Sequence, residues 1–345
     1  MEGPINYLEH YLLDKNYTVY RIDHPLANYG TRETLVYKNS LVIKIFSRVN
    51  LSVLNLLIDF FLSIYYCSVL PGKNKTLIGA NNFDTLAALT YKLFNKGNVR
   101  KIIYFAADYS ENRYGNALLD WVYVIVEKLV LKYSDVVVSN THRAEKKRIS
   151  LGLNTKKSVV VPNGVYLDSP TFKNKKINNN NFIYIGNVTP EHGLLAMIRV
   201  LKDLNMSLTV IGGGSGWKEL EKFVRKEGIY TKLYKDKPHS FVIDYLKDFK
   251  GWGLAPYNND SLWTVYCSPL KVNEYIASGI PVVVSSVPEI SKEISEKGLG
   301  VVYKNLNGED LAKNISEFNS INFNLKAKSF YSYYNYNCLY SLISL

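Results

Sequence analysis

Lys271 and Glu274 stand three positions apart in the stretch that runs from Ser268 to Ile290. Ser268 is a good N-cap and the proline after it fits the first helical position, so the pattern predicts a helix that ends at Gly279. The positive end of such a helix favours an anion, the Lys271 ammonium can reach that anion, and Glu274 lies one turn further along the same face. A nucleotide diphosphate offers matching groups, namely phosphates and then ribose hydroxyls. An ordinary capped helix with a solvated Lys/Glu pair fits the same spacing.

This segment reads SPLKVNEYIASGIPVVVSSVPEI and resembles the nucleotide-binding segment of the GT-B glycosyltransferases, specifically the Glycos_transf_1 or family-four group in its SPLK-type variant. The resemblance implies that Glu274 binds the donor ribose and that Lys271 contacts the donor diphosphate, with Ser268 and Leu270 as further donor contacts. Many relatives carry a second glutamate eight residues before the first. Tyr266 stands at that position here, so the resemblance does not extend to donor-sugar contacts through that carboxylate.

Two glycine-containing loops also resemble the donor site of this family. Gly186 and Asn187, followed by PEHG with His192 and Gly193, resemble the family's loop GR..PEKG, and Asn187 and His192 replace its two cations. For His192, a surface turn is an equal alternative. The second loop, Gly212 to Gly214, lines the donor cleft in the family and supplies Gly213. A dinucleotide motif fails there because its third glycine would fall on a tryptophan.

Asp108 lies in the segment IIYFAADYSENRYGN, just past a predicted buried strand, at the carboxyl edge where α/β ligands bind. The segment resembles the part of relatives in which an aspartate is the catalytic base, and a carboxylate there could take the proton of an acceptor hydroxyl. Asp108 could equally cap the loop or pair with Arg113. Retaining and inverting chemistry both stay open.

The sequence encodes no DxD triplet, and its five histidines are scattered, so we expect no catalytic metal and no cofactor besides the nucleotide-sugar substrate. Three cysteines without a CxxC favour a reducing, cytoplasmic location. The N-terminus shows no signal-peptide pattern. Residues 51–70 are long enough to span a bilayer but contain Asp59, which favours a buried or interfacial helix.

The net charge of +12 predicts an anionic partner. The run HRAEKKRISLGLNTKK, from His142 to Lys157, is either a solvated helix face or a peripheral contact with an anionic membrane surface. We expect no nucleic acid because no basic–aromatic binding motif is present.

Strands alternate with helices along most of the chain, which predicts an α/β protein with parallel sheets. With the resemblance, this indicates the GT-B architecture, two Rossmann-like domains whose sheets face across a cleft. We expect an acceptor-binding domain over residues 1–165, in which the usual first strand is missing, a linker at 166–180, a nucleotide-sugar domain at 181–323, and C-terminal helices at 324–345 that cross back to the first domain.

These features predict a metal-independent hexosyltransferase that moves a sugar from a nucleotide-sugar donor to a glycan or a lipid-linked acceptor. A GT-B-shaped sugar-nucleotide epimerase and a non-catalytic nucleotide-sugar binding protein are the alternatives.

Overall fold

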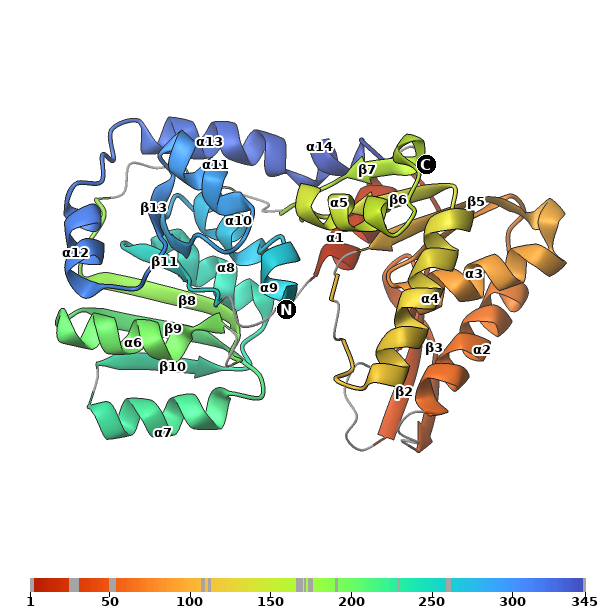
Figure 1. The fold of residues 1–345 in the computed structure, drawn as a ribbon, viewed down its shortest axis with the longest axis horizontal. Coiled ribbons are helices and arrows are strands. Elements are labelled where there is room, and N and C mark those ends of the chain that lie inside the picture. Colours follow the sequence, from red (N-terminus) through yellow and green to blue (C-terminus); the bar gives the residue numbers. More distant parts are fainter. Residues whose placement is uncertain are drawn as a thin grey trace. The chain divides into compact units, whose positions relative to one another are not determined.

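The computed structural model describes residues 3–24, 31–49, 54–106, 109–110, 113–165, 170, 172, 176–189, 192–228, 230–258 and 262–343 (Figure 1). The chain divides into two compact units, one formed by Gly3–Val161 with Tyr340–Leu345 and the other mainly by Pro162–Leu339. We call them the first and the second unit.

The first unit begins with a helix and an antiparallel sheet: α1 (Pro4–Asp14), β1 (Tyr20–Asp23), β2 (Thr31–Lys38) and β3 (Leu41–Val49). The rest alternates between helices and strands, ending in a parallel sheet of order β4-β5-β6-β7. These elements are α2 (Leu54–Val69), β4 (Lys75–Gly79), α3 (Asn82–Phe94), β5 (Val99–Ala106), α4 (Ala117–Tyr133), β6 (Val136–Ser139), α5 (His142–Ser150) and β7 (Ser158–Val160).

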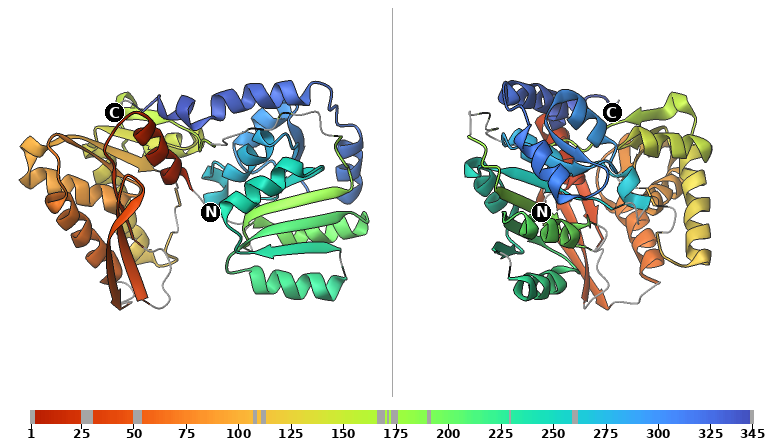
Figure 2. Two further views of the ribbon diagram at one scale, coloured as in Figure 1. Left: turned by 180° about the vertical axis from the view of Figure 1, so that it is seen from behind. Right: turned by 60° about the vertical axis from the view of Figure 1, so that its left-hand side comes forward.

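Local signals explain where several of these helices begin. Asn81, Asn116 and Thr141 each accept hydrogen bonds from backbone N–H groups of the first turn of α3, α4 and α5, respectively. The helix α3 packs against both α2 and α4. The three helices therefore form one layer over the parallel sheet (Figures 1 and 2).

The second unit contains a six-stranded parallel sheet of order β10-β9-β8-β11-β12-β13. Its strands are β8 (Asn181–Asn187), β9 (Ser207–Gly213), β10 (Thr231–Lys235), β11 (Trp252–Ala255), β12 (Val282–Ser285) and β13 (Gly300–Tyr303). Its helices are α6 (Leu194–Asp203), α7 (Trp217–Glu227), α8 (His239–Asp248), α9 (Leu262–Tyr266), α10 (Leu270–Ala277), α11 (Ile290–Lys297), α12 (Gly308–Ser316), α13 (Phe323–Tyr334) and α14 (Tyr336–Tyr340). Helix α6 lies on one face of the sheet and α8 on the other (Figures 1 and 2).

The core of this unit is apolar. Phe182 and Tyr184 on β8, Trp217 on α7 and Trp252 on β11 are almost completely buried in one hydrophobic cluster. Their aromatic surface stabilises the contact between sheet and helices.

Helix α13 lies in the second unit, and α14 ends at the first residue of the C-terminal segment that belongs to the first unit. A bridge between Val165 and Asn335 holds the end of α13 in the second unit. Tyr340, at the end of α14, belongs to the first unit, where its hydroxyl donates to the Pro4 carbonyl and its ring packs edge-on against Tyr11 and Phe105.

Candidate functional site

The strand order of the second unit defines the position of its candidate site. From β8 the chain runs outward through β9 to β10, and then returns to β11 on the other side of β8. In a parallel sheet, such a reversal leaves a crevice at the carboxyl ends of the two strands, where α/β proteins bind ligands. Gly186 and Asn187 form the carboxyl end of β8, and Pro256 to Asn258 follow β11.

Helix α10 is fastened beside this crevice by tyrosine and asparagine side chains. The Tyr275 hydroxyl accepts from the backbone N–H of Ile185 on β8 at 2.8 Å. The same hydroxyl lies 3.2 Å from the Ile183 carbonyl oxygen and 3.3 Å from that of Leu254 on β11. At the other end, Asn163 is held by the residues before and in α10. Its side chain donates to the Ser268 carbonyl, and its own carbonyl accepts from Asn273.

The predicted cap of this helix is wrong by one residue. The N-cap is Pro269, not Ser268, and α10 begins at Leu270. Ser268 is buried and its hydroxyl accepts from the Asn163 backbone N–H at 3.0 Å, so a long-range contact has taken the oxygen that a cap would use. Leu270 packs against Val165 and Ala277.

Lys271 is buried at the start of α10, with only 8% of its surface exposed. Among the described residues its Nζ has no hydrogen-bond partner, and it lies 3.9 Å from the ring centroid of Tyr184 and 5.4 Å from that of Tyr257. Burial lowers the pKa of Lys271 to about 7. The two rings favour the charged form through cation–π contact. An ammonium held in this way is suited to bind an anion that supplies the missing hydrogen bonds.

Glu274 is buried one turn further along α10 and has a partner that the sequence did not predict. His239, the first residue of α8, places Nε2 2.7 Å from Glu274 Oε1. This contact joins the start of α8 to α10. His239 and Glu274 are 35 residues apart in the chain, and no local motif links them.

His192 is buried, so the structure contradicts the alternative of an exposed surface turn. Its Nδ1 lies 2.6 Å from the Asn187 carbonyl and 2.9 Å from the Tyr184 hydroxyl, and its ring packs edge-on against Tyr257 and Trp263. Tyr184 and Tyr257 are the rings that also contact Lys271. The structure therefore places His192 and Lys271 around the same two tyrosines, at the carboxyl ends of β8 and β11.

Two of the predicted glycines lie close to neighbouring loops of this site, and only Gly193 is required by the backbone. Gly193 precedes α6 with φ +62°, and a Cβ there would lie 2.4 Å from Asn258 Oδ1 and 2.6 Å from the Pro256 carbonyl oxygen. A Cβ on Gly213, at the end of β9, would lie 2.1 Å from Asp236 Oδ1. A side chain at position 193 would therefore displace the loop after β11, whereas one at position 213 would displace only the Asp236 side chain.

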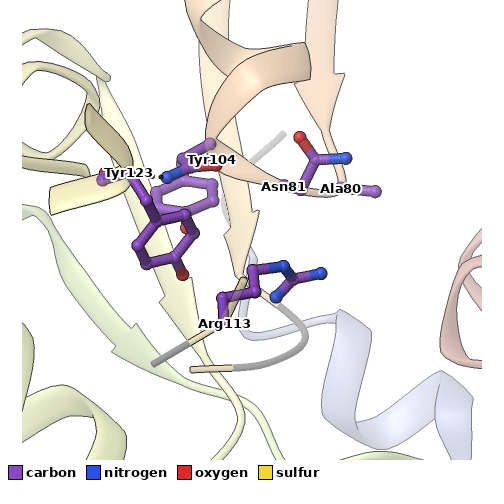
Figure 3. Close-up of a pocket in the computed structure, with 6 residues that line it drawn as sticks. Ala80, Asn81, Tyr104, Arg113 and Tyr123 are labelled. Carbon is purple, nitrogen blue, oxygen red and sulfur yellow. Dashed lines mark hydrogen bonds between the residues drawn. The ribbon is translucent and has the colours of Figure 1, made fainter. Parts of the chain in front are cut away.

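In the first unit, Asp108 lies outside the described residues, so its predicted role stays a prediction. The same unit contains a small pocket at the carboxyl ends of β4 and β5 (Figure 3). It is lined by Ala80, Asn81, Asn82, Tyr104, Arg113 and Tyr123. Arg113 brings a guanidinium to this lining, whereas the side-chain amides of Asn81 and Asn82 donate within the unit, to Asp84 and to the Tyr123 carbonyl.

Beside this pocket, Glu127 and Arg148 form a completely buried ion pair, with 3.1 Å between Glu127 Oε1 and Arg148 Nε. Tyr104 donates to the other carboxylate oxygen at 2.7 Å, and Arg148 donates to Ser139. The prediction that all cations of residues 142–157 face the solvent or a membrane is therefore wrong for Arg148. It is held inside the unit by Glu127 and is not available to a membrane surface. Lys157 also donates to the carbonyls of Lys132 and Ser134.

Comparison with known proteins fits this arrangement. Residues 168–333 match the family model of the glycosyl transferases group 1. The similar solved structures show that the chain has the GT-B fold.

Three similar proteins illustrate the likeness. HepE from Anabaena, solved in complex with UDP, matches with a TM-score of 0.61 at 13% identity, over 83% of this chain and 80% of that one. The lipopolysaccharide outer core galactosyltransferase WaaB, in its apo form, matches with a TM-score of 0.56 at 15% identity, over 85% and 81%. An uncharacterized 41.2 kDa protein in the cps region of Klebsiella pneumoniae is 25% identical over 244 residues, which are 67% of this chain and 64% of that relative. The match thus spans less than two thirds of that relative's length.

Proposed function

We propose that this protein is a metal-independent glycosyltransferase that moves a sugar, as a hexosyl group, from a nucleotide-sugar donor to a glycan or a lipid-linked acceptor. The observation that carries the proposal is the buried Lys271 ammonium, which lies at the switch point of the GT-B second unit and has no hydrogen-bond partner in the part of the chain that the structure describes. A donor diphosphate would satisfy that cation with charge-assisted hydrogen bonds.

In this proposal Lys271 binds the diphosphate and Glu274 accepts hydrogen bonds from the ribose. His192 and Asn187 lie at the carboxyl end of β8 and line the phosphate side, while Gly193 and Gly213 keep the loops close enough for the donor to reach the backbone. Ser268 and Leu270 act indirectly, because their contacts position α10. HepE was solved with UDP, which makes a uridine nucleotide the first donor to test.

The acceptor is assigned to the first unit. In the pocket that Arg113 lines, the guanidinium is the group suited to bind acceptor hydroxyl or phosphate oxygens. Asp108, in the segment between β5 and α4, remains our candidate for the base that takes the acceptor proton, in either stereochemical course. An inverting reaction would need that base more strongly than a front-side retaining one.

Product analysis tests this function against its alternatives. The purified chain is incubated with UDP-sugars, then with GDP-, ADP- and dTDP-sugars, with and without acceptor glycans and lipid phosphates, in the presence of EDTA. Release of nucleotide diphosphate that increases with acceptor, together with a glycosylated product, is expected. Sugar isomerisation without acceptor would instead establish an epimerase, and binding without any turnover would establish a non-catalytic binding protein.

A further inference from the structure

Helix α2 of the first unit has its polar residues inside and its apolar residues outside. The buried side carries Asn55, Asp59, Ser63 and Tyr66. The exposed side carries large apolar residues at spacings of three or four, which we call the α2 face: Leu54, Leu57, Phe61, Tyr65 and Val69, exposed by 55, 57, 65, 49 and 51%. A helix in water has the opposite arrangement.

The polar residues of the inner side are used within the unit. His24 places Nε2 2.9 Å from Ser63 Oγ and Nδ1 3.3 Å from Asp59 Oδ1, while Nδ1 also lies 3.2 Å from Thr34 Oγ1. These contacts fix the orientation of α2 about its axis. The apolar side therefore cannot turn inward without leaving this buried polar cluster unsatisfied.

Helix α4, on the other side of α3, carries a second exposed apolar stripe at the same spacings. We call it the α4 face: Leu118, Trp121, Ile125, Leu129 and Tyr133. Single exposed apolar residues are common on soluble proteins, but two stripes of five residues on one helical layer indicate a surface that contacts an apolar medium.

Exposed lysines lie beside these apolar stripes. Lys128 and Lys132 are exposed in the last turns of α4, between the apolar positions. Lys44 of β3 is exposed and lies 6.0 Å from the ring of Tyr65. The chain as a whole carries a net charge of +12. Apolar and aromatic residues flanked by lysines are the composition that binds the interface of an anionic bilayer.

No helix in the described ranges is both long and apolar enough to cross a membrane. The 16 residues of α2 extend over about 24 Å, and a helix with a polar inner side would lie along the membrane plane.

We propose that the first unit docks peripherally on an anionic lipid bilayer through the α2 face, with the α4 face and its lysines in the same headgroup region. This moves the membrane contact from the predicted cation run of α5 to α2 and α4, and it gives the chain direct access to acceptors that reside in a membrane. The docking itself does not depend on the proposed transferase activity.

Vesicle flotation of the full chain tests the docking. Wild-type protein is mixed with vesicles of phosphatidylcholine alone or with an equal part of phosphatidylglycerol, at low and at high salt. We expect binding to the anionic vesicles, partly retained at high salt because the apolar contribution is not screened. The double variant Leu57→Ser/Phe61→Ser should lose at least tenfold in binding. The control Ile321→Ser/Leu325→Ser changes two residues that are equally exposed on the second unit, and it should bind like wild type.

Trp121 provides a second readout, since it is 62% exposed whereas Trp217 and Trp252 are buried. Brominated lipid should quench the part of the fluorescence that the Trp121→Phe variant lacks. Absence of wild-type binding to anionic vesicles, or equal binding by the Leu57→Ser/Phe61→Ser variant, would overturn the proposal. So would a wild-type dimer in light scattering that this variant converts to a monomer, because a second copy would then cover the α2 face. UDP affinity, measured in parallel on both double variants, should be unchanged, so a failure of docking is separable from a failure of the donor site.

Discussion

Replacement of Lys271 by methionine removes the buried ammonium of the candidate donor site and keeps an unbranched side chain. A lysine in the unfolded chain has the ordinary pKa of 10.5, and burial lowers the pKa of Lys271 in the folded protein to about 7. The folded protein therefore loses this proton at a lower pH than the unfolded chain. The cost of burying the charge is fully present below pH 7 and declines as the pH rises toward 10.5, so wild-type stability should increase with pH over that range.

The size of this effect follows from the two pKa values. Linkage gives a gain of ~2.5 kcal/mol in the free energy of unfolding of wild type between pH 6 and pH 9. The Tyr184 ring, 3.9 Å from Nζ, favours the charged form and reduces the gain toward ~1 kcal/mol. The Lys271→Met variant has no such titration. Its advantage in stability over wild type should therefore be larger at pH 6 than at pH 9 by ~1 to ~2.5 kcal/mol.

Urea unfolding of both proteins at pH 6, 7.5 and 9 measures this difference. Trp217 and Trp252 are buried in the second unit, so their fluorescence reports its unfolding. Lys292→Met, at a lysine whose side chain is 81% exposed, is the control and should show the wild-type pH dependence. In the same samples, Lys271→Met should weaken UDP binding by roughly 10- to 100-fold. An unchanged pH dependence together with wild-type UDP affinity would refute the assignment of Lys271.

Three further predictions concern other residues. His239→Ala removes the partner of Glu274 and should weaken UDP binding about tenfold without changing the circular dichroism spectrum, whereas unchanged affinity would make the pair purely structural. Asp108→Asn should keep UDP affinity and lower turnover at saturating donor and acceptor on the order of a hundredfold or more; near-normal turnover would exclude a general base at this position. Arg148→Met leaves Glu127 buried without its counter-ion and should lower the free energy of unfolding in urea by ~3–5 kcal/mol. The exposed control Arg143→Met should change it little, and equal stability of the two variants would contradict the buried pair.

Elements with strong local signals could be predicted from the sequence. Helix α7 is such an element, because its apolar period and the glycines on either side mark it locally. The helix of residues 51–70 was predicted to be buried or interfacial, and α2 is indeed helical with an exposed apolar side. The strand β13 carries no such signal, since a run of four residues with three apolar side chains fits a short strand and a buried helix segment equally well.

The candidate site could be predicted only in part. Lys271 and Glu274 lie on one helix, so their spacing placed them together. His239 meets Glu274 from α8, and Tyr184 meets Lys271 from β8, and only the packing of distant elements brings these groups into contact. For Arg148, a contact between distant elements likewise made the prediction from the sequence wrong. Its place in a cationic run suggested solvent exposure, while the buried carboxylate of Glu127 comes from α4.

The most direct test of the donor site is a calorimetric titration of UDP into wild type, Glu274→Ala and Glu296→Ala. Glu274 is buried in the site, whereas the Glu296 side chain is 64% exposed on α11 of the same unit. We expect saturable binding of UDP to wild type and to Glu296→Ala, and a loss of roughly 1.5 to 3 kcal/mol of binding free energy for Glu274→Ala. Equal affinity of Glu274→Ala and wild type for UDP would contradict it.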